Sequence, residues 1–270
     1  MADPTAQMGL HMGKSAFDAG QQYLESNMNR WVNVASLKHY FNVSNSYVVS
    51  KLRLVLFPWW HRPWSRTQHL SHNGGQDFGV YAPPREDINS PDMYIPLMAL
   101  VTYILFSTLL AGLRRTFHPE LFGLTATTAL VVVFLEIAII RLAMYLLSIN
   151  NESQLLDLVA YSGYKFVGVI LTLLLSEIAN RGGGSGGWVG WGVFIYTFAA
   201  NGFFLLRSLK YVLLPDTSPN TNSGQAYTAS RSHRQRRTQF LFIYSFPLQF
   251  LFMWILTRDS VPTAVLTGSK

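Results

Sequence analysis

Hydrophobic residues in this sequence gather into five long runs, all of them in the C-terminal two thirds of the chain. Each run is close to the roughly 20 residues that an α-helix needs to cross a bilayer. None of the runs has the charged face at helical period that marks a helix on the surface of a soluble protein. The pattern predicts five membrane-spanning helices, at residues 94–113, 121–147, 155–179, 188–209 and 240–256.

The region before the first run, residues 1–92, follows a different pattern and is predicted to form a cap on one side of the membrane. Apolar residues at helical spacing predict a short amphipathic helix from Phe17 to Ala35. Residues 47–57 alternate, with leucines on one side, which predicts a strand or a segment lying along another surface. Residues 69–90 are rich in Gly, Asn, Pro and Asp and predict an irregular lead-in to the first span.

The composition agrees with a membrane protein. Charged residues make up 13% of the chain, about half of the roughly 25% that is usual in soluble domains. The chain has no cysteine, which excludes a disulfide framework, thiol catalysis and cysteine metal sites. The predicted fold class is therefore an all-α integral membrane protein, with five transmembrane helices in residues 93–258, the N-terminal cap and a short tail in residues 259–270.

The distribution of positive charge predicts the orientation of the chain. Its net charge of +7 would suggest a nucleic-acid partner in a soluble protein, but loop charge beside a membrane explains it and no nucleic acid is expected. Fourteen lysines and arginines flank the predicted spans on the side of the N-terminus, against five on the opposite side. Because positive loops stay in the cytoplasm, we expect a cytoplasmic N-terminus and a lumenal C-terminus.

One stretch of the cap mixes tryptophan with cationic residues, which is the chemistry of the lipid headgroup layer. It predicts a phospholipid membrane as a partner of the cap, with interface anchors at Trp59, Trp60, Arg62, Trp64 and Arg66. A small packed cap that does not touch the membrane is the alternative, and the sequence leaves both open.

Two familiar motifs occur in the wrong context. Residues 182–187 read GGGSGG, which matches both G-x-G-x-x-G and G-x-S-x-G, but they lie between two predicted membrane helices. His69, His72 and Asp77 lie near each other in sequence without a further fixed ligand. We therefore expect no catalytic residue, no metal site and no cofactor, and predict that the protein is not an enzyme.

Charged residues inside the spans are costly in a bilayer and usually face the helix bundle. Glu136 and Lys165 lie roughly 16 Å and 15 Å from the neighbouring ends of the second and third spans, at 1.5 Å per residue. Arg141 is only about 9 Å deep and can extend to the interface. The matching depths predict an ion pair between Glu136 and Lys165. An ion or proton path is the alternative, and it would suit a lipid-moving or small-solute transport protein.

Several segments resemble the Yif proteins, the Yip-interacting factors of the wider Yip family. The resemblance covers roughly residues 13–258. The segments that carry it are DMYIPLMA at 92–99, AYSGYKFVGV at 160–169, RSLKYVLLPD at 207–216 and LKHYFNVSNSYVVSKLRLVLFPWWHRPWSR at 37–66. Compared with the general Yip patterns D-L-Y-G-P and G-Y-x-x-P, Ile95 replaces a glycine and Val167 replaces a proline, as suits the Yif branch.

The resemblance implies a non-enzymatic role in transport between the endoplasmic reticulum and the Golgi, in the membranes of both. The implied partners are a Yip-family membrane protein, a small Yos-type membrane protein, Rab GTPases and the COPII coat. The residues that match the family motifs are expected to make partner or structural contacts: Asp92, Tyr94, Pro96, Gly163 and Tyr164. Helix-end geometry is the alternative reading of the same residues, since Pro96 suits a first helical turn and Gly163 permits close packing of helices.

The orientation can be tested by glycosylation. Asn42 and Asn151 lie in acceptor sequons, and the charge distribution places both on the cytoplasmic side, where no glycan is added. We predict that the protein from a eukaryotic host does not shift on a gel after endoglycosidase treatment. A shift that Asn151→Gln abolishes would show that the predicted orientation is wrong.

Overall fold

The computed structural model describes residues 34–73, 76–115, 117–146, 152–179, 187–213 and 235–259, together with Lys14. Most of the amphipathic helix predicted between Phe17 and Ala35 lies outside the described residues, as does nearly all of the GGGSGG segment. The predicted C-terminal tail also lies outside them, apart from Asp259.

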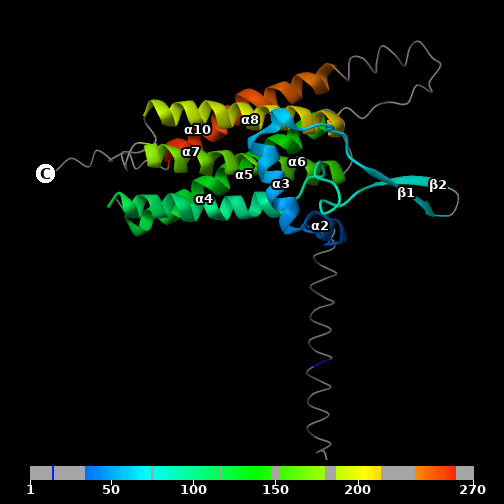
Figure 1. Cartoon of the computed structure of the whole chain (residues 1–270), viewed down its shortest axis with the longest axis horizontal. Helices are drawn as coiled ribbons and strands as arrows, with labels where there is room; N and C mark the ends of the chain where they lie inside the picture. Colours follow the sequence, from blue (N-terminus) through cyan, green and yellow to red (C-terminus); the bar gives the residue numbers. More distant parts are fainter. Residues whose placement is uncertain are drawn as a thin grey trace, which may run out of the picture.

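Five long apolar helical stretches lie side by side and form the body of the molecule (Figure 1). Each is long and apolar enough to cross a membrane: Tyr94–Leu113, Pro119–Leu146, Leu156–Ala179, Trp188–Lys210 and Gln235–Arg258. The helices that build them are α4 (Tyr94–Leu113), α5 (Pro119–Leu146), α6 (Glu152–Gly163), α7 (Lys165–Ala179), α8 (Trp188–Leu213) and α10 (Gln249–Asp259). These helices confirm the predicted fold class.

Two of the five stretches are irregular at one point. The third is divided at Tyr164, which lies between α6 and α7. The fifth contains the π-helical turn η2 (Tyr244–Leu248), with Pro247 inside it. Proline has no N–H for the helical ladder, and π turns occur mostly as single turns inside α-helices.

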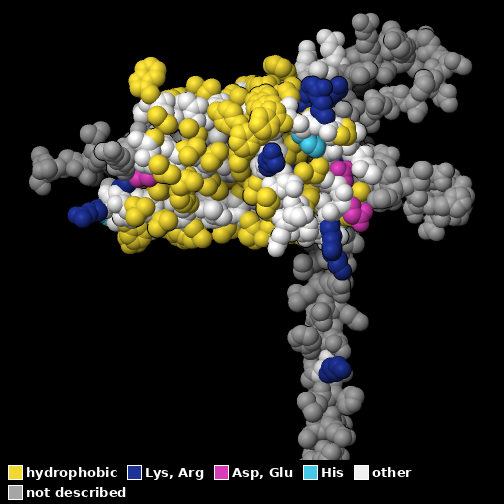
Figure 2. Space-filling view, viewed as in Figure 1, with side chains coloured by type: hydrophobic (Ala, Val, Ile, Leu, Met, Phe, Trp, Pro, Cys, Tyr) yellow, Lys and Arg dark blue, Asp and Glu magenta, His cyan; other side chains and the backbone are white. Residues whose placement is uncertain are grey.

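The surface of the bundle suits a lipid environment. Figure 2 shows hydrophobic side chains over most of its visible face, with most of the charged side chains near the two ends. Large apolar side chains such as Phe134 and Leu105 are 67% and 58% exposed, which would be costly in water and is favourable in hydrocarbon.

The described part of the cap contains two helices, a 3₁₀ turn and a hairpin. These are α2 (Val34–Tyr40), α3 (Asn45–Leu56), η1 (Pro58–Trp60), β1 (Gln68–Asn73) and β2 (Gln76–Tyr81). β1 and β2 pair antiparallel, with Gln68 opposite Tyr81. The prediction of an irregular lead-in over residues 69–90 was wrong for residues 69–81, which contain the hairpin, and agrees with residues 82–90, which form no helix or strand.

Residues 45–56 form the helix α3, so the predicted strand over residues 47–57 is wrong. The alternative prediction, a segment lying along another surface, agrees with the position of α3 across the long helices (Figure 1). Ser44 begins the helix, and its side chain accepts a hydrogen bond from the Tyr47 amide at 3.3 Å. The buried residues of α3 recur at helical spacing: Tyr47, Lys51, Leu54 and Val55. One of the four positions that define this inner face is a lysine, which hides the helical period from a count of apolar residues.

Packing joins the cap to one end of the bundle. Tyr47, Leu54 and Trp64 of the cap share a hydrophobic cluster with residues of α6 and α8, among them Tyr161 and Phe204. A second cluster within the bundle includes Tyr103 of α4, Phe166 of α7 and Phe252 of α10. Figure 1 shows α3 running across the long helices instead of along them.

Candidate functional site

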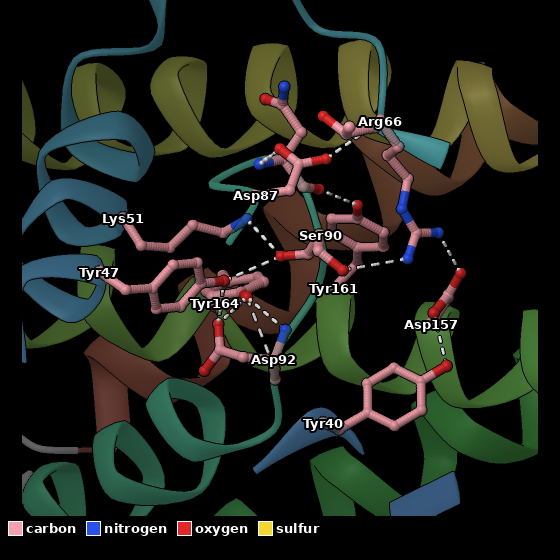
Figure 3. Close-up of polar contacts among 12 residues, drawn as sticks. Tyr40, Tyr47, Lys51, Arg66, Asp87, Ser90, Asp92, Asp157, Tyr161 and Tyr164 are labelled. Atoms are coloured by element: carbon pink, nitrogen blue, oxygen red, sulfur yellow. Dashed lines mark hydrogen bonds and ion pairs between the residues drawn. The ribbon is translucent and has the colours of Figure 1, made fainter. Parts of the chain in front are cut away.

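Polar side chains are buried where the cap meets the bundle, an assembly that we call the cap–bundle junction (Figure 3). Its members come from α2, α3, the loops before and after the hairpin, α6 and the break between α6 and α7. They are Tyr40, Tyr47, Lys51, Arg66, Asp87, Ser90, Asp92, Asp157, Tyr161 and Tyr164. Lys51, Asp92 and Tyr164 are each 0% exposed, so these polar groups depend on one another for partners.

Asp92 connects three elements of the junction. One carboxylate oxygen accepts a hydrogen bond from the Ile95 amide at 2.7 Å, in the first turn of α4. The other accepts from the Tyr47 hydroxyl of α3 at 3.0 Å and from the Tyr164 hydroxyl. A carboxylate at this position satisfies an amide with no partner in the helix and complements the helix dipole. Asp92 therefore fixes the start of α4 against both the cap and the third span.

The family-motif residues meet at the same place, with one exception. Gly163 lies so close to Pro96 that an added Cβ would overlap the proline ring and come within 3.2 Å of the Pro96 Cα. The Tyr164 hydroxyl accepts from the Asp92 amide at 3.1 Å. Tyr94 is the exception, because its side chain at the start of α4 is 37% exposed and is not part of this contact. The two matched motifs, distant in sequence, thus form one contact between α4 and the break in the third span.

Lys51 is the buried lysine on the inner face of α3. Its Nζ donates to the carbonyl oxygens of Ile88 at 2.6 Å and Ser90 at 3.0 Å. Burial lowers the pKa of Lys51 to about 7, outweighing the attraction of Asp92 and Asp87, which raises it. Between pH 10.5 and about 7, Lys51 is protonated in the unfolded chain and neutral in the folded protein. Its burial therefore lowers the free energy of unfolding progressively as the pH falls through this range, and the loss is complete below about pH 7.

A second set of contacts attaches the cap to α6. Arg66 donates to one oxygen of Asp157 at 2.6 Å, and the Tyr40 hydroxyl donates to the other at 2.6 Å. Burial and the Asp157 carboxylate raise the pKa of Tyr40, which keeps its hydroxyl protonated as a donor. Arg66 also donates to the Ser90 hydroxyl at 3.3 Å, which joins this ion pair to the rest of the junction.

The predicted interface anchors divide into two groups. Trp60 is 80% exposed, Trp59 is 45% exposed and Arg62 is exposed. Trp64 is only 8% exposed and packs against Phe203 and Phe204, both at 6.2 Å between ring centroids. The assignment of Trp64 and Arg66 as membrane-interface anchors is therefore corrected, because aromatic packing and the Asp157 ion pair turn them toward the protein.

A separate polar centre lies inside the bundle. The structure brings Glu136 of α5 and Lys165 of α7 together as an ion pair with both side chains 0% exposed. Glu136 also accepts from the Tyr244 hydroxyl at 2.9 Å and from the Gln249 side chain at 2.6 Å. Three spans therefore share one carboxylate, and the π-helical turn η2 places Tyr244 and Gln249 on it together.

Several residues of these sites escaped the sequence analysis. Tyr47, Lys51 and Tyr40 lie in a region predicted as a strand or left without a role, and Asp157 is 91 residues away from its partner Arg66. Gln249 carried a usable signal, because a polar residue within an apolar run needs a buried partner.

Comparison with known proteins gives one consistent family. The family model described as YIF1 matches residues 2–257. The chain is 50% identical over 253 residues to "Protein transport protein yif1" of Schizosaccharomyces pombe, covering 94% of this chain and 82% of that protein. It is 35% identical over 257 residues to "Protein YIF1A" of Mus musculus, covering 95% and 80%. It is also 35% identical over 269 residues to "Protein transport protein YIF1" of Saccharomyces cerevisiae, covering 94% and 81%. No solved structure matches the chain.

The contact between Gly163 and Pro96 predicts a packing defect in Gly163→Ala. The new methyl group must displace the proline ring or the α4 backbone, and overpacking of this kind costs about 1–3 kcal/mol. Thermal unfolding in detergent should show a lower Tm. Gly123→Ala is the matched control, because an added Cβ at Gly123 of α5 meets nothing within 4 Å. Equal Tm values for the two variants would contradict the close contact.

The ion pair in the bundle predicts strong coupling between its partners. Glu136→Gln and Lys165→Met should each lower the free energy of unfolding in detergent by about 3 kcal/mol, because each leaves one buried charge without its partner. The double variant should recover part of the loss. A double-mutant cycle measures this coupling, and losses that simply add would contradict it.

Proposed function

The chain belongs to the YIF1 family, and on this premise we propose that it is a non-enzymatic membrane adaptor in vesicle transport between the endoplasmic reticulum and the Golgi. The two yeast relatives carry the name "protein transport protein", which supports a role in membrane traffic. In this proposal the protein resides in the membranes of both compartments as a multi-pass protein.

The proposed partners follow from the family. The bundle joins a Yip-family membrane protein and a small Yos-type membrane protein within the bilayer. The cap, on the cytoplasmic side, contacts Rab GTPases and the COPII coat. This orientation agrees with the excess of lysine and arginine in the cap and in the loop between the fourth and fifth spans.

The attachment of the cap to the bundle is the observation that carries the proposal. Buried hydrogen bonds and the Arg66–Asp157 ion pair hold the cap on the ends of α4 and α6. An adaptor needs such a connection, because a partner bound to the cap must stay in a fixed position relative to partners bound in the membrane. A cap tethered by a flexible linker would not provide it.

The alternative is a lipid-moving or small-solute transport protein that uses the charged bundle. The buried centre at Glu136 is the feature that suggests it, since charges inside a membrane often mark a transport path. In this bundle, however, the carboxylate is already paired with Lys165 and accepts from Tyr244 and Gln249. Such a set favours a structural role for the centre, which leaves the adaptor as the better supported function.

Affinity purification in mild detergent tests the adaptor function. The tagged protein should retain a Yip-family membrane protein and a Yos-type protein through the wash, as mass spectrometry would show. Liposomes that contain the purified protein should show no lipid scrambling and no solute flux above protein-free vesicles. Flux that Glu136→Gln abolishes, without capture of a Yip-family protein, would favour the transport alternative.

A further inference from the structure

The helix α3 and the turn η1 pack against two of the membrane spans. At one end of α3, the Tyr47 hydroxyl bonds Asp92, which precedes α4 by two residues. At the other end, the Trp59 ring lies 4.6 Å from the ring of Phe203 in α8. Phe203 precedes Lys210, the last residue of the fourth span, by seven residues or about 10 Å of helix. The start of α3 therefore lies at the end of the first span, and the element runs across the bundle (Figure 1). Its end at Leu56 reaches Tyr196 of α8, which precedes Lys210 by 14 residues or about 21 Å of helix.

The outward face of this element is apolar and aromatic, with cations beside it. Val49 is 68% exposed, Phe57 46% and Trp60 80%, while Arg53 and Arg62 are also exposed. Val49 and Arg53 lie one turn apart on α3, on the side opposite the buried Tyr47 and Lys51. The helix ends at Leu56, and beyond it the rings of Phe57 and Trp60 are stacked with their centroids 6.3 Å apart. A helix with apolar and aromatic residues beside arginines is suited to the layer between headgroups and acyl chains.

This outward face continues into the lipid-facing surface of the bundle. The Tyr196 hydroxyl of α8 donates to the Leu56 carbonyl at 2.9 Å, and the Tyr196 ring lies 6.2 Å from that of Phe57. Tyr196 and its neighbour Ile195 are 38% and 57% exposed within the fourth span. Lipid that covers these residues of α8 therefore also meets Phe57 and Trp60.

We propose that α3 and η1 form an interfacial helix, seated in one leaflet of the bilayer, whose outward face binds anionic phospholipid. Val49, Phe57 and Trp60 insert among the acyl chains, and Arg53 and Arg62 contact the headgroups. The residues differ from the anchors expected from sequence, because Trp64 and Arg66 face the protein and Val49, Arg53 and Phe57 take their place. This surface binds lipid whether or not a partner protein is present.

The absence of cysteine from the chain permits a direct measurement of depth. Val49→Cys and Trp60→Cys, each carrying a nitroxide label, are compared in proteoliposomes of phosphatidylcholine and phosphatidylserine. Accessibility to oxygen and to a water-soluble nickel complex reports the depth of each label. Phe134→Cys, in the middle of α5 and 67% exposed, is the deep reference, and Lys38→Cys, exposed on α2, is the reference for water.

The labels at positions 49 and 60 should lie about 5–10 Å into the headgroup–acyl boundary, between the two references. Nickel accessibility equal to that at position 38 would overturn the proposal, because the face would then be free in water and open to a protein partner. All labelled positions are exposed, so the Tm of each variant should match that of the unlabelled protein.

The double variant Arg53→Gln and Arg62→Gln tests whether the two arginines bind anionic headgroups. In anionic vesicles the label at position 60 should move outward in this double variant, whereas in pure phosphatidylcholine it should not move. An equal depth in both lipids, with and without the arginines, would overturn the binding of anionic headgroups. Arg85→Gln, an exposed arginine of the loop after the hairpin, is the matched control for loss of charge.

Discussion

The carboxylate of Asp92 is the interaction on which the arrangement of cap and bundle depends. It accepts from the first turn of α4, from Tyr47 of α3 and from Tyr164 at the break of the third span. Because Asp92 is fully buried, each of these donors also offsets the cost of removing the charge from water. The Asp92 side chain therefore holds together the start of α4, the helix α3 and the Tyr164 ring at the break of the third span.

The sequence predicted the parts of the fold that a local pattern encodes. Apolar runs of sufficient length identified the five spans, and matched depth suggested that Glu136 and Lys165 meet. The prediction from sequence was wrong for α3. Over twelve residues, a helical sequence with a buried lysine and several β-branched residues has nearly the same pattern as an alternating strand. The roles of Arg66 and Asp157 had no local signal, since their pairing depends on the folded position of residues 91 positions apart.

Two arginines lie at the end of the bundle away from the cap, and the structure explains the position of one of them. Arg114 and Arg115 lie on the side that the charge distribution assigns to the lumen, against the usual preference for the cytoplasm. Arg114 donates hydrogen bonds to both carboxylate oxygens of Glu177 and forms an ion pair that joins the end of α4 to the end of α7. Arg114 therefore stabilises the packing of two spans, and its presence on this side says little about the orientation of the chain in the membrane.

The burial of Lys51 follows from the irregular backbone that precedes α4. Residues 87–93 have no continuous helix or strand, yet the carbonyl groups of Ile88, Asn89 and Ser90 accept hydrogen bonds from side chains of the cap and of α6. Backbone of this kind is stable near a membrane only if protein groups satisfy its acceptors. Lys51 donates to the carbonyls of Ile88 and Ser90, Tyr47 donates to Ser90, and Tyr161 donates to Asn89. A leucine at position 51 would leave the Ile88 carbonyl without this donor, so the lysine supplies hydrogen bonds that an all-apolar inner face of α3 lacks.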